Sequence, residues 1–427
     1  VHGVPGVQAC DSPQRIPNCE GGSCGQRGGV QWPRRIPRLF QLHQGQRHRL
    51  LRWRALEDPQ KVLCPNPAEL WHGKKKHRGA DPGRRQLPAG GAEENGSGKP
   101  FDPVFILSRS VSNIICSVVF GSRFDYDDER LLTIIHFIND NFKIMSSPWG
   151  EMYNIFPSVL DWIPGPHKRL FRNFGGMKDL IARSVREHQD SLDPNSPRDF
   201  IDCFLTKMAQ EKQDPLSHFN MDTLLMTTHN LLFGGTETVG TTLRHAFLIL
   251  MKYPKVQARV QEEIDRVVGR SRMPTLEDRT SMPYTDAVIH EVQRFADVIP
   301  MNLPHRVTRD TPFRGFLIPK GTDVITLLNT VHYDSDQFKT PQEFNPEHFL
   351  DDNHSFKKSP AFMPFSAGRR LCLGEPLARM ELFIYFTSIL QNFTLQPLVD
   401  PEDIDLTPLS SGLGNLPRPF QLCMHIR

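Results

Sequence analysis

The stretch that decides the fold and the site is Phe365-Ser366-Ala367-Gly368-Arg369-Arg370-Leu371-Cys372-Leu373-Gly374. A helix is predicted to begin near Cys372 and to run to about residue 392. A cysteine just before a helix lies among main-chain N–H groups that lack intrahelical partners, and these donors stabilise its thiolate. Gly368 and Gly374 let the backbone bend and approach a flat cofactor closely. Phe365 can pack against a macrocycle, and Arg370 can pair with a carboxylate.

The ten positions from Phe365 to Gly374 argue against the commoner role of a lone cysteine, which is a buried thiol. The stretch resembles the cysteine signature of the cytochrome P450 family, Phe-x-x-Gly-x-Arg-x-Cys-x-Gly, and matches it at every fixed position. The resemblance implies a mainly α fold with small β-sheets. It also implies haem b (iron protoporphyrin IX) bound through the Cys372 thiolate. Thiolate ligation lets such a haem push electron density toward O–O cleavage, which is the chemistry of a monooxygenase.

An acid and a base lie three residues apart at Glu291 and Arg294, inside a helix predicted over 283–296. Residues at i and i+3 share a helix face, so the two charges can pair, either at the surface or in a buried network. By resemblance they are the Glu-x-x-Arg element, a structural ion pair behind the haem. In the family an arginine completes this network. Here His348 takes that position, which leads to the hypothesis of a weaker or pH-dependent network.

Two adjacent glycines, Gly234 and Gly235, lie inside a long helix predicted over 221–252. Each costs about 1 kcal/mol relative to alanine, which indicates close packing or ligand approach unless the helix is simply flexible there. A local groove would leave the hydroxyl of Thr238 free to hydrogen-bond dioxygen, and Glu237 supplies an acid. The resemblance makes these two residues the catalytic pair that delivers protons for O–O scission, by general acid chemistry.

The segment from Val298 to Asp310 follows the Glu-x-x-Arg helix and reads on its own as a loop turning into a strand. By resemblance, Ile299 and Leu303 line the substrate pocket and His305 reaches a haem propionate. The resemblance adds three further pocket residues, Phe233 and Gly234 on the long helix and Leu413 near the C-terminus.

Residues 99–427 read as one cytochrome P450 catalytic domain, incomplete beside the family pattern. Further helices are predicted over 101–120, 128–143, 176–190 and 253–268, with strand-like sequence over 303–328 and an irregular stretch over 335–365. No run of about eighteen apolar residues predicts a transmembrane helix. Eight scattered cysteines in 427 residues indicate a reducing compartment rather than a disulfide scaffold.

Residues 1–98 have a different composition, with sixteen Lys/Arg against eight Asp/Glu, whereas residues 99–427 carry 35 against 40. Dense glycine and proline would break most helices there. A basic nucleic-acid arm and a zinc site are alternatives, but the cysteine spacings do not match paired zinc knuckles. We expect a segment unlike the family, either disordered or read from the true exons in a shifted frame. The family's N-terminal lobe would then be missing, and haem would be held weakly.

Two phrases, Met282–Glu291 and Met363–Gly368, are similar to the vertebrate microsomal family two of cytochromes P450, and to its F subfamily. That resemblance implies oxidation of small, flat, aromatic foreign compounds at the cytoplasmic face of the endoplasmic reticulum membrane. NADPH would supply electrons through NADPH–cytochrome P450 reductase, with cytochrome b5 as a further partner. An acidic reductase would suit the basic residues near the cysteine, which are Lys357, Lys358 and Arg369.

Two rival functions stay open. The first is a non-functional truncated or frame-shifted product that does not hold haem. The second is a haem-thiolate isomerase or dehydratase that needs no reductase, and the pair of Glu237 and Thr238 argues against it. No nucleic-acid partner is expected.

Overall fold

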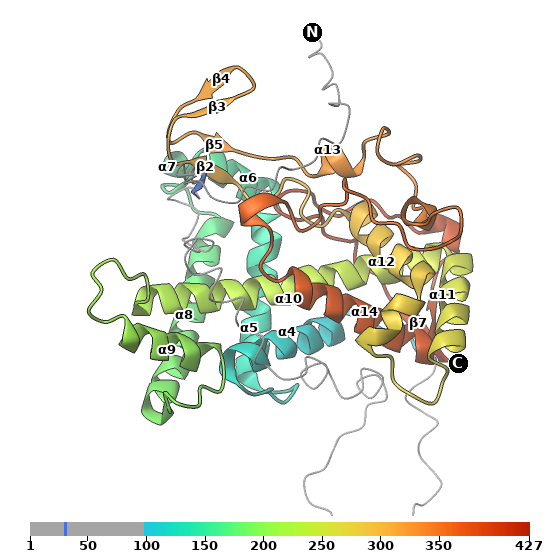
Figure 1. Ribbon diagram of the computed structural model, residues 1–427, viewed down its shortest axis with the longest axis horizontal. Coiled ribbons are helices and arrows are strands. Elements are labelled where there is room, and N and C mark those ends of the chain that lie inside the picture. The colour runs from blue at the N-terminus through green and yellow to red at the C-terminus, as the bar shows by residue number, and fades with distance from the viewer. Residues whose placement is uncertain (1–29, 32–97) are drawn as a thin grey trace, which may run out of the picture.

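The computed structural model describes residues 30–31 and 98–427. This part of the chain is mainly α-helical with small β-sheets, so the predicted fold class is confirmed (Figure 1). The expectations for residues 1–29 and 32–97 lie outside the described residues; these concern disorder, a zinc site, a nucleic-acid arm and a shifted frame. Val30–Gln31 forms a short strand, β1, which the sequence did not predict.

The helices account for most of the described chain. In order they are α4 (Val104–Phe120), α5 (Glu129–Met145), α6 (Pro148–Ile155), α7 (Pro157–Leu160), α8 (Pro166–Ser191), α9 (Phe200–Gln210), α10 (Met221–Lys252), α11 (Pro254–Val267), α12 (Pro283–Ala296), α13 (Asn329–His332) and α14 (Glu375–Asn392). Four short 3₁₀ segments are η1 (Leu276–Ser281), η2 (Pro346–Phe349), η3 (Gly368–Arg370) and η4 (Pro401–Asp403).

The strands are short and form three small antiparallel sheets. One has the order β1, β2 (His305–Val307) and β5 (Asp323–Val324). A hairpin joins β3 (Thr311–Phe313) and β4 (Phe316–Ile318), and β6 (Phe393–Pro397) pairs with β7 (Leu422–Ile426). Phe101 bridges to Leu422, so the start of the described domain lies beside its end.

Local signals set the ends of the best-predicted helices. The Asn220 side chain accepts the N–H of Thr223 and caps α10, which spans the predicted 221–252. Pro283 lies in the first turn of α12, and Asp297 ends that helix in a left-handed conformation with φ 42°. Both boundaries depend on residues next to them in the chain, so sequence alone locates them.

Helix α8 begins ten residues before the predicted start at 176, and a tertiary contact explains the difference. The pair Gly175 and Gly176 would weaken an isolated helix. Gly176 packs beneath Phe137 of α5, where an added Cβ would come within 2.9 Å of the ring. The close contact with α5 therefore explains why glycine occupies position 176 inside a continuous helix. Helices α6, α7, α9 and α13 were not predicted either.

Two hydrophobic clusters form the core, and α10 contributes to both. One joins the second half of α10 with α11, α12, α14 and the sheet of β6 and β7. The other joins its first half with α4, α5, α8 and α9. Figure 1 shows α10 running across the width of the molecule, with α14 in contact with it. In the described part of the chain, no helix combines the length and apolar character needed to cross a membrane.

Candidate functional site

The cysteine loop brings the Cys372 sulfur to the start of α14. The Cys372 N–H donates to the Phe365 carbonyl at 2.9 Å and closes the loop, and Gly368 bends it with φ 70°. Gly374 is the N-cap of α14 and has no side chain to cap the helix. A Cβ added to Gly374 would lie 3.9 Å from the Cys372 Sγ. The sulfur thus lies close to the N-terminus of α14, and a helix N-terminus is an environment that favours a thiolate.

Two basic side chains come together beside this loop. His305 opens β2, and Arg370 ends η3. Burial, and then the charge of Arg370, lower the pKa of His305, and burial lowers the pKa of Arg370. The two side chains are half-buried, and a carboxylate beside them would offset the cost of burying their charged forms. The site also has open space beside Gly368, where an added Cβ meets nothing within 4 Å. These residues fit a haem, for which Cys372 would hold the iron and Arg370 and His305 would bind a propionate.

Arg379 is a residue of this site that sequence analysis missed. Its guanidinium pairs with Glu375 at 2.9 Å, donates to Nε2 of His290 at 3.0 Å and lies 5.1 Å from the ring of Phe365. It therefore holds the first turn of α14, α12 and the cysteine loop together. The i, i+4 spacing of Glu375 and Arg379 was a usable signal, but the contact with His290 spans 89 residues of chain.

On α10, the predicted catalytic pair occupies two different environments. Glu237 is 5% exposed, accepts the Thr241 hydroxyl at 3.2 Å and lies 3.7 Å from Arg244. Burial raises the pKa of Glu237, and the charge of Arg244 opposes this only in part. Thr238 is half-buried, and its hydroxyl donates to the Gly234 carbonyl at 2.8 Å. The expectation of a free Thr238 hydroxyl was therefore wrong, because an unbroken helix offers it an acceptor one turn back.

The residues predicted to line the pocket gather in one cluster. Phe233 and Leu413 are buried in it, and Ile299 and Leu303 pack against it. Leu377, in the first turns of α14, packs against the same cluster, which brings the cluster toward the cysteine loop. Gly234 adds open space, since an added Cβ there would meet nothing within 4 Å. Four residues from three distant parts of the chain thus meet in one hydrophobic cluster.

The predicted ion pair of Glu291 and Arg294 is fully buried, and His348 joins it. Arg294 donates to both carboxylate oxygens of Glu291, at 2.7 and 2.8 Å, and Nδ1 of His348 lies 3.2 Å from the same carboxylate. Nε2 of His348 accepts the main-chain N–H of Thr340 at 3.2 Å. These two roles require a neutral ring with its hydrogen on Nδ1. The network therefore contains a neutral histidine, and the surface alternative for the ion pair is excluded.

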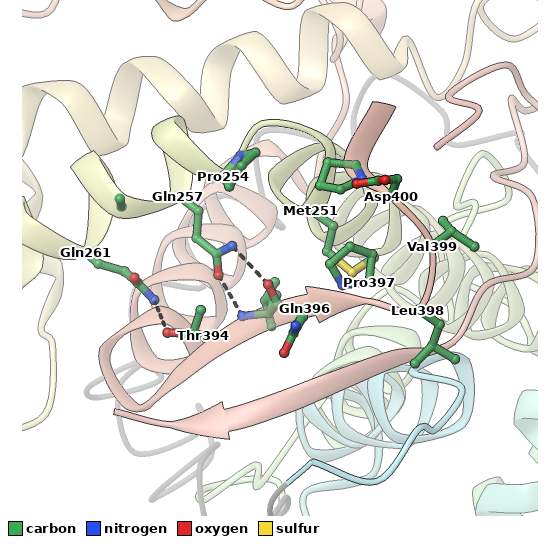
Figure 2. Close-up of a pocket in the computed structure, with 13 residues that line it drawn as sticks. Met251, Pro254, Gln257, Gln261, Thr394, Gln396, Pro397, Leu398, Val399 and Asp400 are labelled. Carbon is green, nitrogen blue, oxygen red and sulfur yellow. Dashed lines mark hydrogen bonds between the residues drawn. The ribbon is translucent and has the colours of Figure 1, made fainter. Parts of the chain in front are cut away.

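A groove of about 530 Å³ lies elsewhere, along the end of α10, the start of α11 and β6 (Figure 2). Gln257 accepts the Leu395 N–H at 2.7 Å and donates to the Leu395 carbonyl at 3.1 Å, and Gln261 donates to the Phe393 carbonyl at 3.0 Å. Strand β6 directly follows the far end of α14, an 18-residue helix of about 27 Å. The groove is therefore remote from Cys372. The side-chain amides of Gln257 and Gln261, which line it, are hydrogen-bonded to the main chain of β6.

A cysteine near a helix N-terminus, with the basic side chains of His305 and Arg370 beside its loop, is what a haem-thiolate protein requires. The family model described as Cytochrome P450 matches residues 90–424. Over 330 residues the chain is 95% identical to cytochrome P450 2F2 of Rattus norvegicus and 83% identical to cytochrome P450 2F1 of Homo sapiens. It is 54% identical to cytochrome P450 2G1 of Oryctolagus cuniculus. Each match covers 77% of this chain and 67% of the relative.

The chain belongs to the cytochrome P450 family, and within it to family two, subfamily F. It is a monooxygenase of the haem-thiolate type.

Proposed function

We propose that this chain inserts one oxygen atom of O₂ into small, flat, aromatic foreign compounds, with electrons from NADPH delivered through a flavoprotein reductase. The carrying observation is the Cys372 sulfur near the N-cap of α14, on a loop whose Arg370 charge also reaches His305. Haem bound through Cys372 would supply the activation of dioxygen, helped by an electron-rich sulfur. Cys372 would hold the iron, and His305, Arg370, Phe365, Gly368 and Gly374 would shape the cradle.

Glu237 is the proton donor in this proposal. A buried carboxyl whose pKa is raised holds its proton closer to neutral pH than an exposed one does. Thr241 and Arg244 fix the carboxyl on one face of α10. The Thr238 hydroxyl gives its hydrogen to Gly234, and its oxygen keeps lone pairs that accept a hydrogen bond from a water. This acid–alcohol pair supports oxygen chemistry over the rival isomerase or dehydratase.

The apolar cluster around Phe233 supports a flat aromatic substrate. The rings of Phe142 and Phe233 lie 6.1 Å apart and tilted by 57°, a geometry in which a third ring gains edge-to-face contacts. Gly414 packs tightly under Phe142, where an added Cβ would come within 2.3 Å of the ring, and this holds Phe142 in place. We expect a fused bicyclic aromatic hydrocarbon to bind more tightly than an alkane with the same number of carbons.

Three exposed basic residues near the cysteine loop, Lys357, Lys358 and Arg369, support docking of an acidic reductase. Cytochrome b5 would compete for the same face. Replacing all three by glutamine should slow reduction by the reductase and weaken its dependence on salt, while reduction by dithionite stays unchanged.

Exposed apolar side chains on α6, α7 and the segment after them support a location on the endoplasmic reticulum membrane. Trp162 is 88% exposed and Ile155 is 66% exposed, with Val159 and Phe156 beside them in sequence. Such side chains bind the interface of a bilayer. Trp162→Ser should reduce binding to phosphatidylcholine vesicles, and Leu398→Ser, at an exposed residue after β6, is the control.

The reduced, CO-bound difference spectrum of the purified chain tests the proposal as a whole. A Soret band at the thiolate position is expected, and Cys372→Ser should abolish both this band and turnover. Cys423 donates to the Gly98 carbonyl in the sheet at the end of the domain, so Cys423→Ser should keep the band. Absence of haem absorbance in the unmodified chain would instead support the non-functional product.

A further inference from the structure

Two loops from different parts of the chain are bridged by one buried histidine. The cysteine loop runs from Met363 to Cys372, and a second loop runs from Asp297 at the end of α12 to His305. His332, in α13, lies between Asp297 and Met363. We propose that His332 is a positioning residue that sets the place of the Cys372 sulfur. This inference rests on the proposed haem site.

The two nitrogens of His332 have opposite roles. Nδ1 lies 2.9 Å from Oδ1 of Asp297, and Nε2 lies 3.3 Å from the main-chain N–H of Met363. The side chain of His332 is 0% exposed and that of Asp297 is 2% exposed. A carboxylate needs a donor and an N–H needs an acceptor, so the ring is neutral with its hydrogen on Nδ1. Nδ1 therefore donates to Asp297, and Nε2 accepts from Met363.

The contact at Met363 reaches Cys372 in two hydrogen bonds. The Met363 carbonyl accepts the N–H of Ser366 at 2.9 Å, and the carbonyl of Phe365 accepts the N–H of Cys372 at 2.9 Å. Ser366 adopts a left-handed conformation with φ 64°. A left-handed conformation is unfavourable for a residue other than glycine, so the neighbours of Ser366 must hold it there. Loss of the anchor at Met363 would let Ser366 relax and would move the Phe365 carbonyl that fixes Cys372.

A second bridge joins the same two loops. The Asn302 side chain donates to Oγ of Ser366 at 3.0 Å, and Asn302 itself is left-handed with φ 55°. Asp297 and Asn302 precede His305 on one short loop, so the cysteine loop and His305 are attached to the same segment. Each His332 nitrogen has its own partner, and Asn302 joins the same two loops through Ser366. A residue that only filled the core would need neither feature.

Two substitutions at His332 separate its nitrogens. The amide of His332→Asn reaches the position of Nδ1, so its NH₂ group can donate to Asp297, but it is too short to accept from Met363. The longer amide of His332→Gln reaches the position of Nε2, so its oxygen can accept from Met363, but it leaves Asp297 without a donor. His348 is the matched control, because it is buried and bridges Glu291 and the Thr340 N–H in the same way, without a bond to the cysteine loop. His348→Asn should therefore lower stability without disturbing Cys372.

The first measurement is alkylation of Cys372 by iodoacetamide in the haem-free full chain, followed by site-resolved mass spectrometry. We expect His332→Asn to slow alkylation about tenfold, the factor that corresponds to one hydrogen bond of about 1.4 kcal/mol. The reason is that a relaxed loop no longer holds the sulfur beside the N-terminus of α14, where the helix dipole assists its attack on the reagent. His332→Gln should stay within about twofold of the parent chain. In haem-loaded protein, His332→Asn should also lower the thiolate fraction of the CO complex.

Equal rates for His332→Asn and His332→Gln would overturn the proposal, as would equal slowing by His348→Asn. A parent chain without any thiolate CO band would contradict the proposed function. In that case slower alkylation in His332→Asn alone would still support positioning.

Discussion

The guanidinium of Arg294 and the carboxylate of Glu291 form a two-point ion pair in which neither side chain is exposed to solvent. Arg294 also donates to the carbonyls of His332 and Pro341, both at 2.8 Å, and to that of Glu343 at 3.0 Å. The Arg294 side chain thus links α12 by hydrogen bonds to α13 and to the irregular segment that leads toward the cysteine loop.

Arg294→Ala should be strongly destabilising. It leaves a buried Glu291 charge without its partner and three carbonyls without a donor, so we expect a loss of about 3–5 kcal/mol in the free energy of unfolding. Urea denaturation measures it. Arg306→Ala is the control, because its pair with Asp323 is partly exposed and should contribute less than about 1 kcal/mol. Similar losses in both variants would contradict the buried network.

The adjacent glycines of α10 should respond oppositely to alanine. In Gly235→Ala the new Cβ would lie 2.8 Å from Cγ1 of Ile115, so we expect overpacking to cost about 1–3 kcal/mol. Gly234→Ala meets no atom within 4 Å, so helix propensity should stabilise the fold by up to about 1 kcal/mol. Thermal unfolding compares the two. Gly234→Ala should also weaken binding of bulky substrates, seen in spectral titrations, if Gly234 borders the pocket.

Glu381 should make stability fall as pH rises. Burial raises its pKa well above the ordinary 4.5, its side chain is 1% exposed, and its Oε2 has no hydrogen-bond partner among the described residues. Above the unfolded-state pKa the carboxyl ionises in the unfolded chain and stays protonated in the folded chain. The free energy of unfolding is therefore unaffected by Glu381 below that pKa and decreases as pH rises above it.

Glu381→Gln should remove this loss. Its advantage over the parent should be small near about pH 4 and larger near about pH 8, when unfolding is followed by urea denaturation across that range. The exposed Glu402→Gln is the control and should leave the profile unchanged. A constant difference between Glu381→Gln and the parent would argue against a protonated Glu381.

Arg370→Ala should change both His305 and haem affinity. Removing the guanidinium takes away the second cause of the lowered His305 pKa, so that pKa should rise toward its ordinary value, as followed by NMR titration of the haem-free chain. A lost charge-assisted hydrogen bond of about 1.5–3 kcal/mol would weaken haem binding roughly ten- to hundredfold in a spectral titration. Arg369→Ala, at the exposed neighbour, should leave both unchanged.

Sequence predicts the parts of this fold and site that depend on neighbours in the chain. Asn220 and Pro283 mark the starts of α10 and α12, and the ten residues up to Gly374 carry the cysteine loop within themselves. The start of α8 was missed because Gly176 is explained by Phe137, a residue of another helix.

The supports of the candidate site were missed for the same reason. The bridge from Asp297 to His332 spans 35 residues, and the contact between His290 and Arg379 spans 89. Neither pair has a spacing that a helix or strand period would reveal. The hydroxyl of Thr238 was misjudged because the glycines before it suggested a local groove, whereas the regular helix offers this hydroxyl the Gly234 carbonyl one turn back.

The two glutamines of α11 have a consequence for how the folded domain meets other molecules. Gln257 occupies the N–H and the carbonyl of Leu395, and Gln261 occupies the carbonyl of Phe393, on the side of β6 that faces away from β7. A strand border with vacant main-chain groups invites a foreign strand to extend the sheet. Here two amide side chains occupy the main-chain groups that a foreign strand would bind. This edge of β6 is therefore protected from intermolecular β-pairing and from the aggregation that follows from it.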